Sequence, residues 1–139
     1  MGSSSLLKDR EMAERLLIDT DVLIDYLRGQ AEAVSYLESL TGSLLVSVIT
    51  LAELYAGVRA GAERTKLDEF IRAFEITLVD REVAIRGGLY RRDYMKSHQV
   101  GLADALIAAT AEHRQAALVT LNSKHFPMLA NVIVPYQKA

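Results

Sequence analysis

The sequence contains no cysteine among its 139 residues. This absence excludes a disulfide framework and a thiolate metal site, so any bound metal must be held by oxygen or imidazole ligands. It also suits a reducing compartment, and we expect a cytoplasmic protein. Only two prolines are present, and no proline- or glycine-rich stretch divides the chain. We therefore predict a single folded domain.

The sequence also lacks a long apolar run. No stretch approaches the roughly 20 residues that span a bilayer. The first residues, MGSSSLLKDREMAER, have neither the apolar core nor the small-residue cleavage site of a signal peptide. We expect no membrane partner. We predict an N-terminal extension over residues 1–15, in which MGSSS is typical of a cloning remnant, and one domain over residues 16–139.

Positive charge is not in excess, because 16 lysines and arginines face 18 aspartates and glutamates, for a formal net charge of −2. A protein that holds nucleic acid by phosphate attraction alone is usually basic. The composition therefore counts against a passive nucleic-acid binder. It counts less against a metal enzyme, whose acids are neutralised by the metal.

Five short apolar runs have the character of buried strands: RLLID, SLLVS, EITLVD, ALVTL and NVIVPY. They are continuous rather than alternating, as expected for strands covered on both faces. Between these runs lie longer segments whose apolar residues have helical spacing. Residues 80–99 are expected to form one helix that begins at Asp80, with Gly87 and Gly88 as a weak or closely packed point. This alternation predicts an α/β fold in three layers, with a five-stranded, mostly parallel sheet between helices.

Polar residues gather where the expected strands end. Asp19 closes the first strand, and Glu53 lies in the first turn of a helix soon after the second. Asp104 lies near the start of the helix before the fourth strand, which Asn122 and Ser123 follow. Ligands of such sheets bind beyond the carboxyl ends of the strands. Carboxylates that converge there repel one another without a cation, and Mg²⁺ prefers oxygen ligands while keeping several waters.

Each acid also has a simpler structural explanation. Thr50 and Glu53 fit the S/T-x-x-E capping box, and Asp104 would complement a helix dipole. Asp19 has an N-cap role available, and for Asp25 we favour a solvated helix face. The joint occurrence of several acids at one sheet edge favours a site over these separate explanations.

The histidines show no metal-binding spacing, so we expect surface or packing roles for them. Four basic residues fall on the helix expected over residues 80–99. A solvated face is the usual explanation for such a run. In a nuclease the same side chains would contact RNA phosphates: Arg86, Arg91, Arg92 and Lys96.

Two families compete for the first acids. LLIDTDVL matches the start of haloacid-dehalogenase-like phosphatases, in which Asp19 would be the nucleophile and Asp21 the acid. That family needs a later acidic pair, and GLADAL supplies one acid. A receiver domain would use Asp80 as phosphate acceptor, but the Lys-Pro expected after the fifth strand is replaced by VPYQK.

A third family accounts for more residues. From about Leu16 to Tyr136 the chain resembles the PIN-domain family, and within it the VapC-type and FitB-type toxin ribonucleases. The resemblance rests on LLIDTDVLIDYLRG, SVITLAELYAGVR, GLADALIAATA and ALVTLNSKHFPML, in this order and spacing. It implies a Mg²⁺- or Mn²⁺-dependent endoribonuclease, in which a metal-activated water cleaves RNA phosphodiesters. A catalytically silent PIN-like binding module is the non-enzyme alternative.

By this resemblance, Asp19, Glu53 and Asp104 are the metal ligands, and Asn122 completes the catalytic set. The family's patterns imply supporting roles for four more residues: Thr20, Asp21, Thr120 and Ser123. Asp21 and His125 depart from the residues usual at their positions.

The family also implies partners. They are a cognate antitoxin, an RNA substrate, and a second copy of the toxin in a homodimer or toxin–antitoxin hetero-oligomer. An antitoxin segment would lie in an apolar groove, for which the candidate residues are Tyr26, Leu27, Val34, Leu37, Leu54 and Tyr55. Core packing competes with this role, since helical spacing of apolar residues is primarily a core signal.

Overall fold

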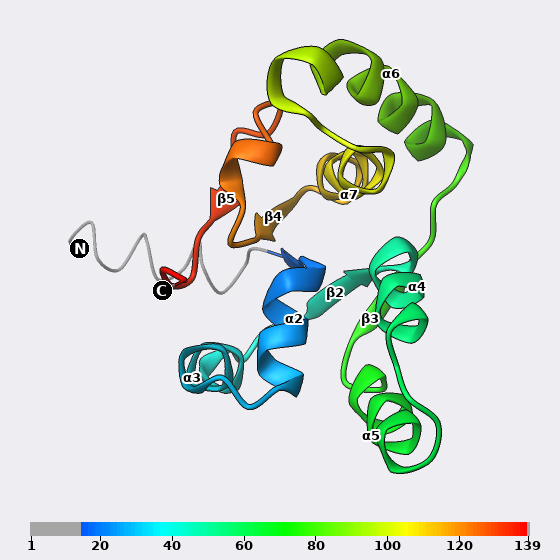
Figure 1. Ribbon diagram of the computed structural model, residues 1–139. Coiled ribbons are helices and arrows are strands. Elements are labelled where there is room, and N and C mark those ends of the chain that lie inside the picture. The colour runs from blue at the N-terminus through cyan, green and yellow to red at the C-terminus, as the bar shows by residue number, and fades with distance from the viewer. Residues whose placement is uncertain (1–14, 139) are drawn as a thin grey trace, which may run out of the picture.

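A computed structural model describes residues 15–138 of the chain. Its centre is one five-stranded sheet, in which every neighbouring pair of strands is parallel and the order is β3-β2-β1-β4-β5 (Figure 1). All five strands expected from the sequence are present: β1 (Arg15–Ile18), β2 (Leu44–Ser47), β3 (Glu75–Thr77), β4 (Ala116–Val119) and β5 (Val132–Ile133). The first strand is central, with β2 on one side and β4 on the other.

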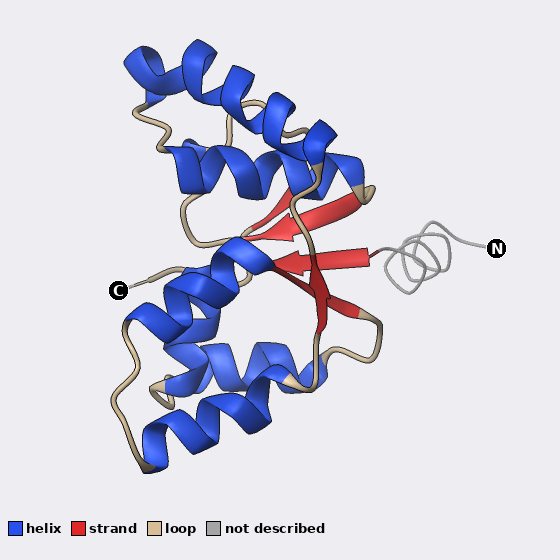
Figure 2. Cartoon of the chain, turned by 90° about the vertical axis from the view of Figure 1, so that its right-hand side faces the viewer, coloured by secondary structure: helices blue, strands red, loops and turns tan. Residues whose placement is uncertain are grey.

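Helices cover both faces of the sheet (Figure 2). They are α2 (Thr20–Leu27), α3 (Ala31–Ser39), α4 (Val48–Ala56), α5 (Ala62–Ile71), α6 (Arg81–His98) and α7 (Leu102–His113), with a short 3₁₀ turn, η1 (Ser123–His125), after β4. The predicted three-layer α/β architecture is confirmed.

Alternation along the strands explains the two layers. Leu17 points into a core cluster with α7, whereas its neighbour Ile18 points into a cluster with α2, α3, α4 and α5. Leu118 and Val119 divide in the same way on β4. Successive side chains of a strand face opposite sides, so an unbroken apolar run is what a sheet buried on both faces requires.

Helices follow directly from strands at the edge that carries the site. Asp19 separates β1 from α2 and caps this helix, while Ser47 ends β2 and caps α4 by accepting a hydrogen bond from the N–H of Ile49. The capping box considered for Thr50 and Glu53 is therefore absent, because Ser47 is the N-cap of α4. Because α4 begins at Val48, Glu53 lies in its second turn rather than its first.

The helix pair α6–α7 packs on the other face. Asp80 caps α6 by accepting a 2.9 Å hydrogen bond from the N–H of Val83, as the sequence predicts. A Cβ added to Gly87 would lie 2.6 Å from Cδ2 and 3.2 Å from Cα of Leu106, whereas one added to Gly88 would meet no atom within 4 Å. Gly87 is thus the close packing point between the two helices.

Residues 1–14 of the predicted N-terminal extension lie outside the described residues, and Arg15 begins β1. Between residues 15 and 138, no helix combines the length and the apolar character needed to cross a membrane.

Candidate functional site

Asp19 occupies the turn between β1 and α2, and its residue is only 6% exposed. One carboxylate oxygen accepts a 2.8 Å hydrogen bond from the N–H of Thr20, and the other accepts one of 2.8 Å from the Thr120 hydroxyl. Burial raises the pKa of Asp19 to about 7, with Asp21 and Asp104 adding to the rise and the two hydrogen bonds opposing it. The three acids are therefore electrostatically coupled.

Asp21 and the turn after β4 hold each other in place. Its Oδ2 accepts a 3.1 Å hydrogen bond from the N–H of Leu121, and its Oδ1 accepts one of 2.8 Å from the N–H of Val22. The Thr120 hydroxyl, which donates to Asp19, accepts a 3.1 Å hydrogen bond from the N–H of Asn122. Thr120 therefore links the turn after β4 to the first acid.

Glu53 reaches the site from α4 through a hydroxyl on α2. The Thr20 Oγ1 lies 2.6 Å from Oε1 of Glu53 and 3.0 Å from Oγ1 of the fully buried Thr50. The residue after Asp19 thus fixes the second acid, so two of the predicted acids are joined through one threonine. This contact replaces the capping role that the sequence offered for Glu53.

Asp104 lies in the first turn of α7, as predicted, and has a partner that the sequence did not indicate. The Nδ1 atom of His125 lies 3.3 Å from Oδ2 of Asp104. His125 ends the 3₁₀ turn that follows β4, close in sequence to Thr120 and Asn122. The same turn therefore contacts two of the acids, Asp19 through Thr120 and Asp104 through His125.

Two other predicted residues lie on this turn. Asn122 precedes η1, and Ser123 is its first residue; both are exposed. The backbone of Asn122 is fixed by the hydrogen bond that its N–H donates to Thr120. The structure therefore brings Asp19, Asp21, Glu53 and Asp104 to the carboxyl edge of the sheet, with Asn122 beside them.

The donor set suits a hard divalent cation. All the gathered acids offer carboxylate oxygens, and the raised pKa of Asp19 reports a buried charge for which a cation would compensate. Among residues 15–138, no group of three or more acid or histidine side chains is arranged closely enough to hold a metal ion. Mg²⁺ retains several of its waters and needs few direct protein ligands, so the residues present fit this ion.

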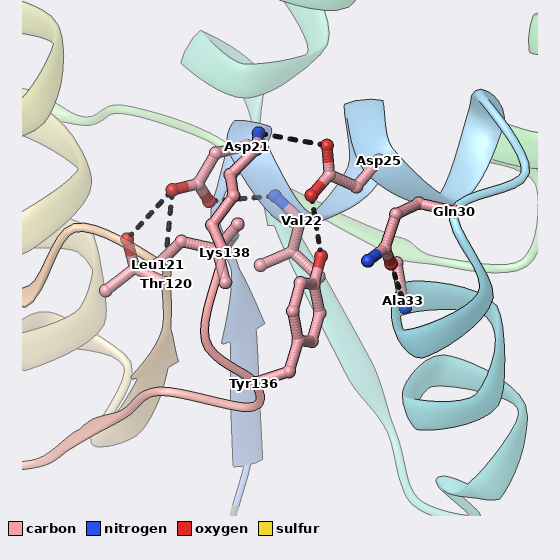
Figure 3. A network of polar contacts seen from close by, with 9 residues as sticks. All are labelled: Asp21, Val22, Asp25, Gln30, Ala33, Thr120, Leu121, Tyr136 and Lys138. Carbon is pink, nitrogen blue, oxygen red and sulfur yellow. Dashed lines mark hydrogen bonds and ion pairs between the residues drawn. The ribbon is translucent and has the colours of Figure 1, made fainter.

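Asp25 is wrongly predicted to lie on a solvated helix face. The residue is 4% exposed, and both of its oxygens accept hydrogen bonds from the segment after β5 (Figure 3). The Tyr136 hydroxyl donates to Oδ2 at 2.9 Å, and the Lys138 ammonium donates to Oδ1 at 3.1 Å. Sequence inspection missed Tyr136 and Lys138, and their only signal was the polar end of a strand that returns to this edge.

The four basic residues predicted as RNA contacts do not share one environment. Arg86 forms a 2.7 Å ion pair with Glu112 near the end of α7, about 12 Å along the helix from Asp104. Arg92 pairs with its neighbour Asp93 at 2.8 Å. Lys96 is exposed in the last turn of α6, at the end that leads into α7, and Arg91 is half-buried.

A groove leads away from Glu53 between α2, α4 and α5, with a volume of about 640 Å³. Leu27 and Leu54 of the predicted groove residues line it, together with Arg28 and Arg59. The remaining predicted residues serve other contacts: Leu37 is buried, Val34 is half-buried, Tyr26 stacks on Phe70, and the Tyr55 hydroxyl donates to Asp68.

Comparison with known proteins extends these observations. A family model described as PIN domain matches residues 16–131. Ribonuclease VapC10 of Mycobacterium tuberculosis is 40% identical over 124 residues, which cover 87% of this chain and 92% of the relative. Ribonuclease VapC1 of Methanocaldococcus jannaschii is 34% identical over 116 residues, which cover 83% of this chain and 81% of the relative.

Solved structures give the same assignment. A toxin–antitoxin complex from Klebsiella pneumoniae matches with a TM-score of 0.78 and 29% identity, over 88% of this chain and 99% of the other. FitAcB from Neisseria gonorrhoeae matches with a TM-score of 0.70 and 29% identity, over 86% of this chain and 97% of the other. The motif resemblance, the family model and the sheet with its acids at one edge agree, and the chain belongs to the PIN-domain family.

Proposed function

We propose that this chain is the toxin of a toxin–antitoxin pair and acts as an endoribonuclease. The single observation that carries the proposal is the set of acids at the carboxyl end of β1. Burial raises the pKa of Asp19, and the nearby charges of Asp21 and Asp104 raise it further. The ribonucleases VapC10 and VapC1 and the toxin–antitoxin complexes with the same fold support this activity. RNA phosphodiesters are the substrate, and a cognate antitoxin is the partner.

We further propose that cleavage depends on Mg²⁺ or Mn²⁺, with Asp19, Glu53 and Asp104 as the residues that would hold the ion directly or through water. Such an ion supplies electrostatic stabilisation of the charge that develops on phosphate oxygens and promotes ionisation of the attacking water. The carboxylates of these three residues would accept hydrogen bonds from the attacking water and so orient it toward the phosphate. Asn122 contributes an amide that can both donate and accept hydrogen bonds at the rim.

Threonines keep these acids in place. The Thr120 hydroxyl donates a hydrogen bond to Asp19, and the Thr20 hydroxyl donates one to Glu53. Preorganised oxygens of this kind need little rearrangement during the reaction, which is where most of the catalytic benefit of fixed polar groups arises. Asp19 is buried, and both of its carboxylate oxygens accept hydrogen bonds. This arrangement suits a metal ligand better than it suits the covalent nucleophile of a phosphatase.

The antitoxin would occupy the groove between α2, α4 and α5. The groove is lined by apolar and basic residues and by Glu53, so a segment lying there would contact one of the proposed metal ligands. Self-association as a homodimer or within a toxin–antitoxin hetero-oligomer is part of the same proposal.

An RNA cleavage assay tests the proposal. The purified chain is incubated with total bacterial RNA in Mg²⁺, and Asp104→Asn is expected to abolish cleavage. Asp80→Asn is the matched control, because it makes the same chemical change at the N-cap of α6, where asparagine also caps well. Cleavage that persists in excess chelator, or in both Asp19→Asn and Asp104→Asn, would contradict the metal mechanism.

Two further measurements separate the alternatives. Hydrolysis of a generic phosphate ester, with a trapped aspartyl-phosphate, would indicate the phosphatase. RNA binding without cleavage in Mg²⁺ and in Mn²⁺ would indicate a silent module.

Induction of the wild type and of Asp19→Asn in a bacterial host, followed by sequencing of RNA ends, would show the target, since new ends are expected from the wild type alone.

A further inference from the structure

The segment after β5 returns to α2 and contacts Asp25. Tyr136 and Lys138 both bond to Asp25 on the inner side of α2, and Figure 3 shows the Lys138 side chain extending between Asp21 and Asp25. These contacts join residues more than 110 positions apart in the chain. None of them involves a residue that the proposed catalytic set uses.

The two ends of the ion pair differ in exposure. The Asp25 side chain is 6% exposed, whereas the Lys138 side chain is 60% exposed. A buried carboxylate requires hydrogen-bonding partners and a nearby positive charge. Asp25 finds both in Tyr136 and Lys138. The ammonium therefore has a position set by a buried group, although most of its side chain faces solvent.

Lys138 keeps hydrogen-bonding capacity in that position. An ammonium group has three N–H donors, and one of them is used by Asp25. The exposure of the side chain leaves the others accessible from outside. A fixed cation with free donors is suited to binding an anion that approaches the surface.

The ammonium also lies at the rim of the acidic site. Figure 3 shows its side chain beside Asp21, whose carboxylate accepts hydrogen bonds from the N–H groups of Leu121 and Val22. Asp21 in turn shares the Thr120 hydroxyl with Asp19. Only the carboxylate of Asp21 therefore stands between Lys138 and Asp19, the first acid of the proposed catalytic set.

An acidic site that must admit a polyanion benefits from a cation at its edge. Two of the basic residues of α6 are less well placed for this purpose, because Arg86 is paired with Glu112 at the far end of α7 and Arg92 is paired with Asp93. Asp25 binds Lys138 from the buried side and leaves its outer side open.

We propose that Lys138 contacts a phosphate of the RNA backbone beside the one that is cleaved, and that Asp25 and Tyr136 are positioning residues that hold its ammonium at the rim of the site. This inference rests on the proposed ribonuclease function and adds a substrate contact to it. Lys138 would bind the ground state and the transition state alike, since its phosphate does not react.

The test is RNA binding by the non-cleaving variant Asp104→Asn. A labelled single-stranded RNA of mixed sequence is titrated at several salt concentrations. Each phosphate contact to a single strand contributes about 0.7 to the slope of log Kobs against log salt. Lys138→Gln is therefore expected to lower this slope by about 0.7 and to weaken binding about fivefold near 0.1 M salt. Lys138→Arg should restore the slope.

Arg72→Gln is the matched control. It removes one positive charge from an exposed side chain just before β3, at the opposite edge of the sheet. It is expected to keep both the affinity and the slope. In the cleaving chain, Lys138→Gln should raise KM and leave kcat unchanged, as expected for a contact that does not strengthen in the transition state.

Asp25→Asn tests the positioning role. If Asp25 acts through Lys138, adding Asp25→Asn to Lys138→Gln should cause no further loss of RNA affinity, although Asp25→Asn alone lowers it. Folding of each variant is verified by urea denaturation, and Lys138→Gln is informative even where Asp25→Asn fails to fold.

The possible failures are distinguishable. If the Asp104→Asn chain binds RNA and Lys138→Gln binds with the same affinity and slope, the pair only fastens the segment after β5 and this inference is overturned. If the unmodified chain neither binds nor cleaves RNA, the proposed function fails and the phosphate contact fails with it.

Discussion

Replacing Asp19 with asparagine should stabilise the metal-free protein, by an amount that depends on pH. The carboxyl group of Asp19 has a pKa of about 7 in the folded chain, compared with 3.8 for an unperturbed aspartate. Because the folded-state pKa is raised, the folded chain binds the proton more tightly than the unfolded chain does. Stability is therefore lost as the pH rises from about 4 to about 7, and no further change from this group is expected above that range.

The magnitude follows from the shift. One pKa unit corresponds to about 1.4 kcal/mol, so ionisation of Asp19 costs the folded state about 4 kcal/mol at pH 8 and between 1 and 2 kcal/mol, roughly, at pH 5. Asparagine carries no charge and still caps a helix well. The stability of Asp19→Asn relative to the wild type should therefore be about 2–3 kcal/mol more favourable at pH 8 than at pH 5.

Urea denaturation in excess chelator at the two pH values measures this difference. Comparing the two proteins at each pH cancels the groups that titrate in both. Asp93→Asn is the control, since it makes the same substitution at an exposed position on α6 and removes no buried charge. A relative stability of Asp19→Asn that is equal at pH 5 and pH 8 would refute the argument, because the buried charge would then have no cost.

Three further results are expected. Mg²⁺ at one hundred times its dissociation constant should stabilise the wild type by about 2.7 kcal/mol and Asp19→Asn by much less, as thermal melting would show. Gly87→Ala should destabilise the chain by about 1–3 kcal/mol through overpacking, whereas Gly88→Ala should stabilise it by about 0.5–1 kcal/mol; urea denaturation that ranks the two variants equally would contradict the close α6–α7 contact. Tyr136→Phe should cost about 1–3 kcal/mol by removing a donor to buried Asp25, measured in the same way.

Much of the fold could be predicted because parallel strands buried on both faces leave an unmistakable pattern. Continuous apolar runs such as LLI and LLV identify the strands, and the acids that follow them fall at one edge by topology alone. The N-cap at Asp80 was also readable, since it depends on local backbone chemistry. The sequence marked Gly87 and Gly88 together, and only the contact with Leu106 of α7 shows that Gly87 is the close packing point.

The missed features depend on distant segments or on unmarked boundaries. Asp25 has helical spacing typical of an exposed acid, but the segment that covers it lies 111 residues away. The start of α4 was misplaced because β2 passes into this helix without a loop, and Val48 and Ile49 suit a strand as well as a helix. His125 approaches Asp104 only through the course of η1, which no periodicity indicates.

The central place of β1 has a consequence for how the protein is made. Ile18 pairs with Val119, and the donors that fix Asp19 and Asp21 include Thr120 and Leu121, about one hundred residues later in the chain. A nascent chain on the ribosome therefore carries Asp19 and Glu53 long before it has β4, and Asp104 is also made before that strand. If the proposed activity is toxic, this order of synthesis keeps unfinished chains harmless, since the last part of the domain must emerge before RNA can be cut.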